Sequence, residues 1–301
     1  MPTTLLDGRA LAATIKGEVA AEVRDHVGTG ARPPHLVAVL VGDHPASASY
    51  VRNKIRSCEE VGFRSTIERL AADATQDEIL AVVRRLNDDD AVDGFIVQLP
   101  LPGHVDEQAV NLAIDPRKDV DGFHPVNFGR MAQGLDAYLP ATPAGILTLL
   151  ARYDVTTAGK RAVVLGRSNI VGAPMSILLS QKRATGNATV TLAHSRTPDV
   201  AGLLREADLI VAAIGRPHFV SADMVSPGAV VVDVGINRVD DPSKKRGYRL
   251  VGDVDFEAVR DRCAAITPVP GGVGPMTVVS LIQNTLRAAR GEVYGSEEVA
   301  R

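Results

Sequence analysis

A tyrosine and a lysine lie four residues apart in the segment Ser49-Tyr50-Val51-Arg52-Asn53-Lys54. The pattern predicts a helix over 48–61, on which Tyr50 and Lys54 share one face because residues four apart are neighbours on a helix surface. An aromatic ring beside an amine suits a flat, hydrogen-bonding substrate. The alternative is structural: the two side chains then only mark the boundary between the buried and the solvated face of the helix.

Two further polar residues stand where ordered segments end. Gln98 closes the apolar strand expected over 92–98, and the prolines that follow it in Leu99-Pro100-Leu101-Pro102 cannot donate to a sheet ladder. An amide at such a strand end can orient a neighbouring amine. Asp121 lies in the turn-rich stretch 118–125, where its carboxylate either accepts two parallel N–H bonds from a ring edge or bonds the backbone of its own turn.

The segment 163–174 reads as a buried strand, a glycine turn and the start of a helix. Gly166 permits the tight turn, Gly172 permits close packing of helix on strand, and the helix N-terminus offers N–H groups to a phosphate. Ser168 stands where the usual dinucleotide fingerprint has its middle glycine. The turn therefore predicts either a dinucleotide site or an ordinary strand-to-helix connection.

The residues after the next expected strand indicate which dinucleotide would bind. His194-Ser195-Arg196-Thr197 contains no carboxylate to receive the ribose 2′-OH of NAD. Ser195 and Arg196, together with Arg167, suit a 2′-phosphate instead, because arginine holds phosphate through paired, charge-assisted hydrogen bonds. We therefore expect NADP as the cofactor. The alternative for each arginine is ordinary solvated charge.

A second glycine-rich stretch, Pro268 to Thr277, follows a candidate strand and opens a helix. Its glycines let the backbone approach a flat ring, and Pro275 suits a first helical turn. The position at the carboxyl end of a parallel strand favours a cofactor or substrate contact. A plain connecting loop is the alternative.

The elements that must position these residues alternate between strands and helices, which predicts an α/β fold of two domains with parallel sheets. We expect a first domain over 1–140 and a second over 141–275, the second a Rossmann-type doubly wound sheet, with a cleft enclosed between the two. The stretch 115–143 reads as the crossing between them. A final helix over 276–290, in a C-terminal segment 276–301, is expected to pack back on the first domain, with Gly291 as its stop. The remaining predicted elements are strands over 35–41, 64–70, 161–165, 188–193, 209–214, 229–234 and 264–266, and a helix over 76–86.

Composition narrows the classes of partner. The chain of 301 residues has a formal net charge of −3 and no basic tract, which argues against nucleic acid and anionic membranes. Its cysteines, Cys58 and Cys263, form neither a disulfide framework nor a metal pair, so we expect a reducing compartment and no metal site. Charges among the first 20 residues leave no room for a signal-peptide core. These features predict a cytoplasmic protein with small-molecule partners.

These motifs, together with Cys58-Glu59-Glu60-Val61-Gly62 and Asp119-Val120-Asp121-Gly122-Phe123, resemble one family over nearly the whole chain. It is the family of bifunctional methylenetetrahydrofolate dehydrogenase/methenyltetrahydrofolate cyclohydrolases, the FolD family. The resemblance implies oxidation of 5,10-methylenetetrahydrofolate to 5,10-methenyltetrahydrofolate with NADP, hydrolysis of that product to 10-formyltetrahydrofolate, and a homodimer. The chain departs from the family in the longer polar link 181–187 and in a basic insertion over 242–249.

The resemblance also implies roles for individual residues. Lys54 is the catalytic lysine, Tyr50 packs on the folate, Gln98 tunes the lysine, and Asp121 grips the pterin. Further substrate contacts are expected at Pro268, Gly271 and Gly272. Cofactor contacts are expected at Gly166, Arg167, Ser168, Gly172, Ser195, Arg196 and Ile236.

The implied chemistry makes different demands in its two steps. Hydride removal leaves a cation delocalised over two nitrogens and requires positioning, not a protein nucleophile. Hydrolysis needs an activated water, for which Lys54 is either the base or an electrostatic guide. Three alternatives remain: a dehydrogenase without the hydrolase activity, using NAD; a non-catalytic NADP-binding sensor; and a quinate- or shikimate-type dehydrogenase. The set of Tyr50, Lys54, Gln98 and Asp121 argues against the last two.

Overall fold

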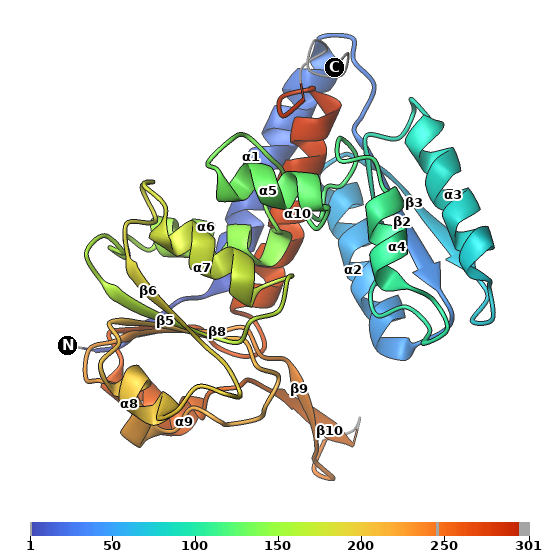
Figure 1. Ribbon diagram of the computed structural model, residues 1–301. Coiled ribbons are helices and arrows are strands. Elements are labelled where there is room, and N and C mark those ends of the chain that lie inside the picture. Colours follow the sequence, from blue (N-terminus) through green and yellow to red (C-terminus); the bar gives the residue numbers. More distant parts are fainter. Residues whose placement is uncertain (1, 245–246, 295–301) are drawn as a thin grey trace. The chain divides into compact units, whose positions relative to one another are not determined.

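The computed structural model describes residues 2–244 and 247–294 (Figure 1). The chain divides into two compact units. We call Met1–Ala12 with Thr142–Thr277 the six-stranded unit, and Ala13–Ala141 with Val278–Arg301 the three-stranded unit. The first twelve residues thus group with the second half of the chain, whereas the sequence analysis placed them in the first domain. Both units are α/β and built on parallel strands, which confirms the predicted fold class.

The three-stranded unit is built on a parallel sheet of order β3-β2-β4. Its strands are β2 (His35–Val41), β3 (Arg64–Leu70) and β4 (Gly94–Val97). All seven residues of the central strand β2 are buried, as expected for a strand paired on both edges and covered on both faces. The helices α2 (Pro45–Glu60) and α3 (Gln76–Asp88) make the crossovers, and a Thr75–Glu78 capping box fixes the start of α3.

Two shorter helices, α4 (Glu107–Ala113) and α5 (Pro125–Ala132), complete the unit together with parts of two long ones. The long helices α1 (Gly8–Gly28) and α10 (Val273–Ala289) lie side by side toward their carboxyl ends (Figure 1), where Arg290 donates 2.8 Å to the Glu22 carboxylate. The stretch 115–141 belongs to this unit and contains α5. The sequence analysis read this stretch as a crossing and did not predict the helix, which starts at Pro125 in a first turn capped by His124.

The six-stranded unit has a parallel sheet of order β1-β11-β8-β7-β5-β6. The strands are β1 (Thr4–Leu5), β5 (Arg161–Leu165), β6 (Thr189–Ala193), β7 (Leu209–Ala212), β8 (Val230–Asp233) and β11 (Ala265–Ile266). Helices α6 (Ala141–Arg152) and α7 (Gly172–Ser180) cover one face, and α8 (Val200–Arg205) and α9 (Phe256–Val259) cover the other (Figure 1). This arrangement confirms the doubly wound sheet.

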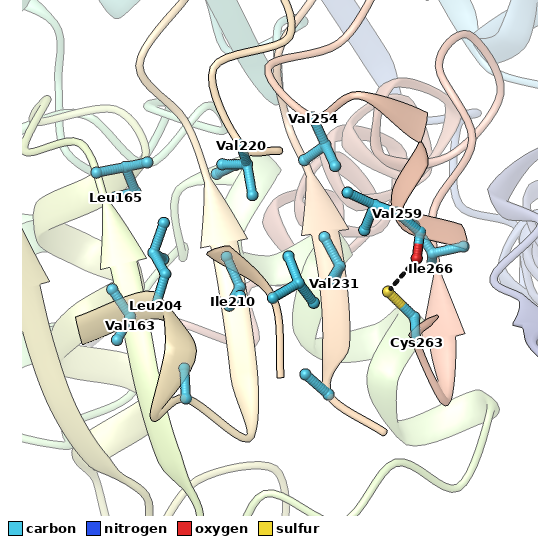
Figure 2. Close-up of a cluster of buried hydrophobic side chains, with 14 of the residues drawn as sticks. Val163, Leu165, Leu204, Ile210, Val220, Val231, Val254, Val259, Cys263 and Ile266 are labelled. Carbon is cyan, nitrogen blue, oxygen red and sulfur yellow. Dashed lines mark hydrogen bonds between the residues drawn. The ribbon is translucent and has the colours of Figure 1, made fainter. Parts of the chain in front are cut away.

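A buried apolar cluster lies between this sheet and the helices α8 and α9 (Figure 2). Val163 and Leu165 of β5 point to the same side because alternate residues of a strand share a face. Leu204 and Val259 reach the cluster from the two helices, and the Cys263 thiol donates 3.3 Å to the Val259 carbonyl. The cluster fixes the strands whose carboxyl ends carry the loops described below.

The basic insertion noted in the sequence forms part of an antiparallel hairpin of β9 (Asn237–Asp240) and β10 (Tyr248–Val251). The Arg238 guanidinium lies 4.0 Å from the centroid of the Tyr248 ring. Residues 245 and 246 of the insertion lie outside the described residues.

The helix α10 ends at Ala289, and Gly291 has the left-handed φ of 64° that suits the expected stop. Residues 295–301 of the expected C-terminal segment lie outside the described part of the chain. None of the helices within 2–244 and 247–294 is long and apolar enough to cross a membrane.

Candidate active site

Helix α2 holds Lys54 and Tyr50 at the edge of its buried face. Val51, Ile55 and Cys58 anchor that face in the core, with exposed fractions of 0%, 8% and 0%. Tyr50 precedes Lys54 by one turn and is 45% exposed, so its ring is a free apolar surface. The Lys54 side chain is only 13% exposed. The sequence predicted this shared face, and the structure confirms the helix that creates it.

The Lys54 amine lies 3.6 Å from a carboxylate oxygen of Asp121. The two side chains come from α2 and from the turn after residue 118, and both are largely shielded, with exposed fractions of 13% and 12%. Because water is mostly excluded from the pair, its electrostatic interaction is stronger than that of a surface ion pair. The turn thus brings a carboxylate to the lysine, a contact that the sequence analysis did not predict.

Asp119, not Asp121, bonds the backbone of this turn. Its carboxylate accepts hydrogen bonds from Phe123 N at 3.1 Å and His124 N at 2.8 Å, and from the Asn127 amide at 2.9 Å. Burial raises the pKa of Asp119 to about 7, although these donors act in the opposite direction. The turn-forming alternative considered for Asp121 therefore describes its neighbour two residues earlier.

The chain on either side of Asp121 is held by close backbone packing. Gly122 has φ of 74°, and a Cβ there would lie 2.5 Å from the Leu139 carbonyl carbon. The Asp121 carbonyl accepts from Ala141 N at 3.2 Å. The Asn284 amide of α10 donates to the carbonyls of Val120 at 2.9 Å and Leu139 at 3.1 Å. Glycine is thus required at 122, and the carboxylate projects from a rigid turn.

Gln98 directly follows β4, where its N–H donates 2.9 Å to the Val39 carbonyl and its side-chain amide donates 2.7 Å to the Leu99 carbonyl. Its side-chain oxygen is buried and has no hydrogen-bond partner among the described residues. The structure therefore contains no Gln98 bond to Lys54. A buried acceptor without a partner costs about 1–3 kcal/mol, so such an atom commonly marks a place where a ligand donates.

In the six-stranded unit, the turn between β5 and α7 depends on two glycines. Gly166 has φ of 117°, and a Cβ there would lie 2.1 Å from the Ala213 carbonyl oxygen. A Cβ on Gly172 would lie 2.0 Å from the carbonyl oxygen of Gly166. The Ser168 hydroxyl accepts from Val171 N at 3.2 Å, which stabilises the start of α7. The serine that replaces the middle glycine of the fingerprint therefore has a local structural role.

Ser195, Arg196 and Arg167 are exposed after the adjacent strands β6 and β5. The turn that carries Arg196 is closed by two bonds of His194: its N–H donates 2.9 Å to the Thr197 hydroxyl, and its Nδ1 accepts from Arg196 N at 3.2 Å. Neither the Arg167 nor the Arg196 guanidinium has an ion-pair partner within 2–244 and 247–294. Two unpaired guanidinium groups and a hydroxyl fit the 2′-phosphate of NADP.

The glycine-rich stretch expected to contact substrate lies in the six-stranded unit, at Pro268, Gly271 and Gly272. It packs on the first turn of α1: Arg9 N donates 2.8 Å to the Gly271 carbonyl, and a Cβ on Gly8 would lie 1.8 Å from the Gly272 carbonyl oxygen. Gly272 N donates 2.8 Å to the Pro268 carbonyl. Chain packing alone therefore explains part of this glycine density.

Ile236 lies in the same unit, in the loop after β8, and is 44% exposed. A Cβ on Gly274 would lie 3.8 Å from its terminal methyl group, so the loop after β8 lies close to the start of α10. The exposed side chain of Ile236 is an apolar contact surface at the carboxyl end of a strand.

Sequence reasoning missed three carboxylates. Asp119, Asp233 and Asp253 are nearly fully buried, with exposed fractions of 2%, 3% and 0%. The only signal in the sequence was a glycine nearby. Asp119 lies three residues before Gly122 and Asp233 lies two residues before Gly235. Asp253 directly follows Gly252. A short acid beside a glycine is typical of a turn that satisfies backbone N–H groups.

The doubly wound sheet, its glycine turn and the unpaired arginines define a dinucleotide-binding α/β protein. Its three-stranded unit carries a shielded lysine–aspartate pair. The family model of the tetrahydrofolate dehydrogenase/cyclohydrolase catalytic domain matches residues 6–121. The model of the NAD(P)-binding domain of the same family matches residues 140–293. The chain belongs to the tetrahydrofolate dehydrogenase/cyclohydrolase family.

Individual members of the family match this chain over nearly their full length. The bifunctional protein FolD of Bacteroides fragilis is 57% identical over 291 residues, which cover 97% of this chain and 99% of the relative. The bifunctional FolD structure of Campylobacter jejuni has 46% identity and a TM-score of 0.90, covering 96% and 99% of the two chains. The Trypanosoma brucei enzyme, solved with NADP cofactor and inhibitor, has 42% identity and a TM-score of 0.91, covering 98% and 100%.

Proposed function

We propose that this chain oxidises 5,10-methylenetetrahydrofolate to 5,10-methenyltetrahydrofolate with NADP and hydrolyses the product to 10-formyltetrahydrofolate. Membership of the family supports both reactions. The observation that carries the proposal for the site is the Lys54–Asp121 pair, 3.6 Å apart and shielded from water. A shielded amine beside a carboxylate suits a substrate that offers both ring N–H donors and an electrophilic carbon.

Four residues of the three-stranded unit act on the folate: Asp121, Tyr50 and Gln98 hold it, and Lys54 acts in the hydrolysis. Asp121 accepts N–H bonds from the edge of the pterin, which draws its carboxylate away from Lys54. The exposed Tyr50 ring packs on the flat substrate. The buried oxygen of Gln98 takes a hydrogen bond from the substrate or from the released lysine amine, which relieves its unsatisfied state.

In the oxidation, these residues hold the methylene bridge in place. Bound NADP supplies the hydride acceptor. Gly166, Ser168 and Gly172 shape the turn that receives the pyrophosphate, and Arg167, Ser195 and Arg196 bind the 2′-phosphate. Ile236 provides an apolar surface on the same edge of the sheet, with Pro268, Gly271 and Gly272 in the neighbouring loop contacting the substrate.

In the hydrolysis, water attacks the methenyl carbon while the Lys54 amine accepts a proton from it. The carbon–oxygen bond forms and the ring carbon–nitrogen bond breaks. One of the two water protons ends on the departing ring nitrogen; the other is released to solvent as the formyl C=O forms, because the methenyl substrate is a cation and the product is neutral. A positioned base of this kind contributes about 10²- to 10⁴-fold. Lys54 therefore matters more to hydrolysis than to hydride removal.

The test is Lys54→Gln, which keeps a polar chain of similar reach but removes the amine. We expect cyclohydrolase activity to fall by about 10²- to 10⁴-fold, and dehydrogenase activity to fall less. Lys16→Gln is the matched control, because Lys16 pairs with Glu60 in the same unit; both activities should survive. Both reactions are followed by absorbance, with NADP or NAD for the first and without cofactor for the second. Equal losses would assign Lys54 to substrate binding, and a wild type active on neither folate would refute the function.

The proposal includes a cytoplasmic location and a homodimer. Light scattering coupled to size-exclusion chromatography measures the molar mass in solution. A mass near twice the 31.8 kDa of the chain would support the dimer, and the mass of one chain would refute it.

A further inference from the structure

The carboxylate of Asp253 gathers four donors from two loops of the six-stranded unit. One oxygen accepts from Ile214 N at 2.7 Å and Gly215 N at 2.9 Å. The other accepts from Arg216 N at 2.8 Å and from the Asn237 side-chain amide at 2.9 Å. Asp253 has no exposed surface. The shape of the loop 214–216 is therefore set by one buried side chain.

A second carboxylate holds the first. Asp233, at the end of β8, accepts from Asp253 N and Gly235 N through one oxygen and from Val254 N through the other, each at 2.9 Å. Asp233 thereby joins the loop after β8 to the turn after β10. The two carboxylates form one network, which we call the carboxylate clamp: Asp233, Asp253 and the loops 214–216, 235–237 and 252–254.

Glycines complete the fit around this clamp. A Cβ on Gly252 would lie 1.7 Å from an Asp233 carboxylate oxygen, and a Cβ on Gly235 would lie 2.3 Å from one of Asp253. Each carboxylate as a whole accepts from three or four donors, so neither can swing aside. Positions 235 and 252 therefore leave no room for a side chain beside the carboxylates.

The clamp lies at the edge of the sheet where a ligand binds. Strand order reverses between β5 and β7, and ligands of open parallel sheets bind outside the carboxyl ends of strands at such a point. Loop 214–216 follows β7 and loop 235–237 follows β8. Figure 2 shows Val220 and Val254, which pair through a parallel bridge, near the tips of the strand arrows.

The proposed 2′-phosphate and pyrophosphate contacts fix which half of the cofactor reaches the clamp. Arg196 follows β6, on one side of β5, and the glycine turn follows β5 itself. A dinucleotide held by these contacts would begin over β6 and cross β5, so its nicotinamide half would extend over β7 and β8. Ile236, exposed between the anchored Gly235 and Asn237, lies in that direction.

We propose that Asp253, held in place by Asp233, is a positioning residue for NADP: it fixes the loops 214–216 and 235–237 in the shape that receives the nicotinamide half. This inference rests on the proposed NADP-dependent function. Preformed loops bind a ligand without the cost of ordering them. Loss of the clamp should therefore weaken NADP binding and leave the hydrolysis, which uses only folate and water, largely intact.

The test variant is Asp253→Asn, which keeps the size but presents one donor in place of an acceptor, so at least one pair of the four donors loses its partner. NADP affinity is measured by titration calorimetry, and both activities are measured in parallel. We expect the NADP Kd and KM to rise about 10- to 100-fold, kcat at saturating NADP to stay within about threefold, and cyclohydrolase activity to stay within about threefold. Asp255→Asn is the matched control. The Asp255 carboxylate caps α9 and lies 4.0 Å from His218 Nδ1, and asparagine caps equally well.

An unchanged Kd in a folded Asp253→Asn variant would overturn the inference, and so would a parallel loss of NADP affinity, melting temperature and cyclohydrolase activity. If this variant does not fold, Asn237→Ala decides, because it removes one donor and leaves the Asp253 backbone bonds. We expect an NADP Kd about 3- to 10-fold higher, whereas a wild-type Kd would overturn the inference. Failure of the proposed function is separate: the wild type would then neither bind NADP nor convert either folate.

Discussion

Replacing Gly172 by alanine tests whether the turn between β5 and α7 controls cofactor binding. The added Cβ would lie 2.0 Å from the Gly166 carbonyl oxygen and 2.8 Å from Arg167 N, both main-chain atoms. Contacts below 3.0 Å essentially never occur, so the turn must open by about 1 Å. Such overpacking costs about 1–3 kcal/mol. For a unit of this size the melting temperature should then fall by roughly 2–12 °C.

A displacement of that size exceeds the roughly 0.5 Å tolerance of a binding site, so we expect the NADP Kd to rise on the order of 10- to 100-fold. Titration calorimetry measures the Kd and scanning calorimetry the melting temperature. Gly17→Ala is the control: Gly17 is exposed within α1, and an added Cβ meets no described atom within 4 Å. That change should stabilise the chain by about 0.5–1 kcal/mol. Wild-type NADP affinity in Gly172→Ala would refute the steric reasoning, as would equal destabilisation by the two variants.

Arg196→Ala and Arg167→Ala should each weaken NADP by about 10- to 100-fold and NAD little, since each removes charge-assisted bonds to the 2′-phosphate; equal losses for both cofactors in steady-state assays would show that the phosphate binds elsewhere. Asp121→Asn should raise the folate KM at least about tenfold with a nearly unchanged melting temperature, whereas lost stability with intact activity would assign Asp121 to the turn. Burial raises the pKa of Asp233 to about 7 from 3.8. Between pH 3.8 and about 7, Asp233 keeps its proton in the folded chain and has lost it in the unfolded chain. The contribution of Asp233 to the free energy of unfolding is therefore lost as pH rises through about 7. Urea unfolding at about pH 5 and about pH 8 should show a smaller loss for Asp233→Asn than for the wild type, and equal losses would contradict this reasoning.

The longer strands of both sheets could be predicted from the sequence because each is a compact β-branched or apolar run between turn residues. The bounds predicted for β2, β3 and β5 are those observed. The strand β1 and the hairpin of β9 and β10 were not predicted. β1 has only the pair Thr4–Leu5, and its place beside β11 depends on a partner about 260 residues later. No local periodicity reports such a pairing.

In the candidate site, too, one feature could be predicted from the sequence and another could not. The shared face of Tyr50 and Lys54 follows from helical spacing, and the structure contains that helix. The contact between Lys54 and Asp121 does not follow from spacing, because it depends on the turn that Asp119 and Gly122 build. In Asp119-Val120-Asp121, the sequence offers two equivalent carboxylates. Only the tertiary fold decides which one bonds the backbone and which one meets the lysine.

The grouping of Met1–Ala12 with Thr142–Thr277 has a consequence for synthesis of the chain on the ribosome. The first strand to emerge, β1, waits for β11 before its hydrogen bonds form. The three-stranded unit likewise lacks its last segment until the residues after 277 have emerged. Neither unit can therefore finish folding while the other half is still being made, unlike proteins whose N-terminal domain folds first. A nascent chain stalled near residue 140 would expose β1 as an unpaired edge and should be a substrate for chaperones.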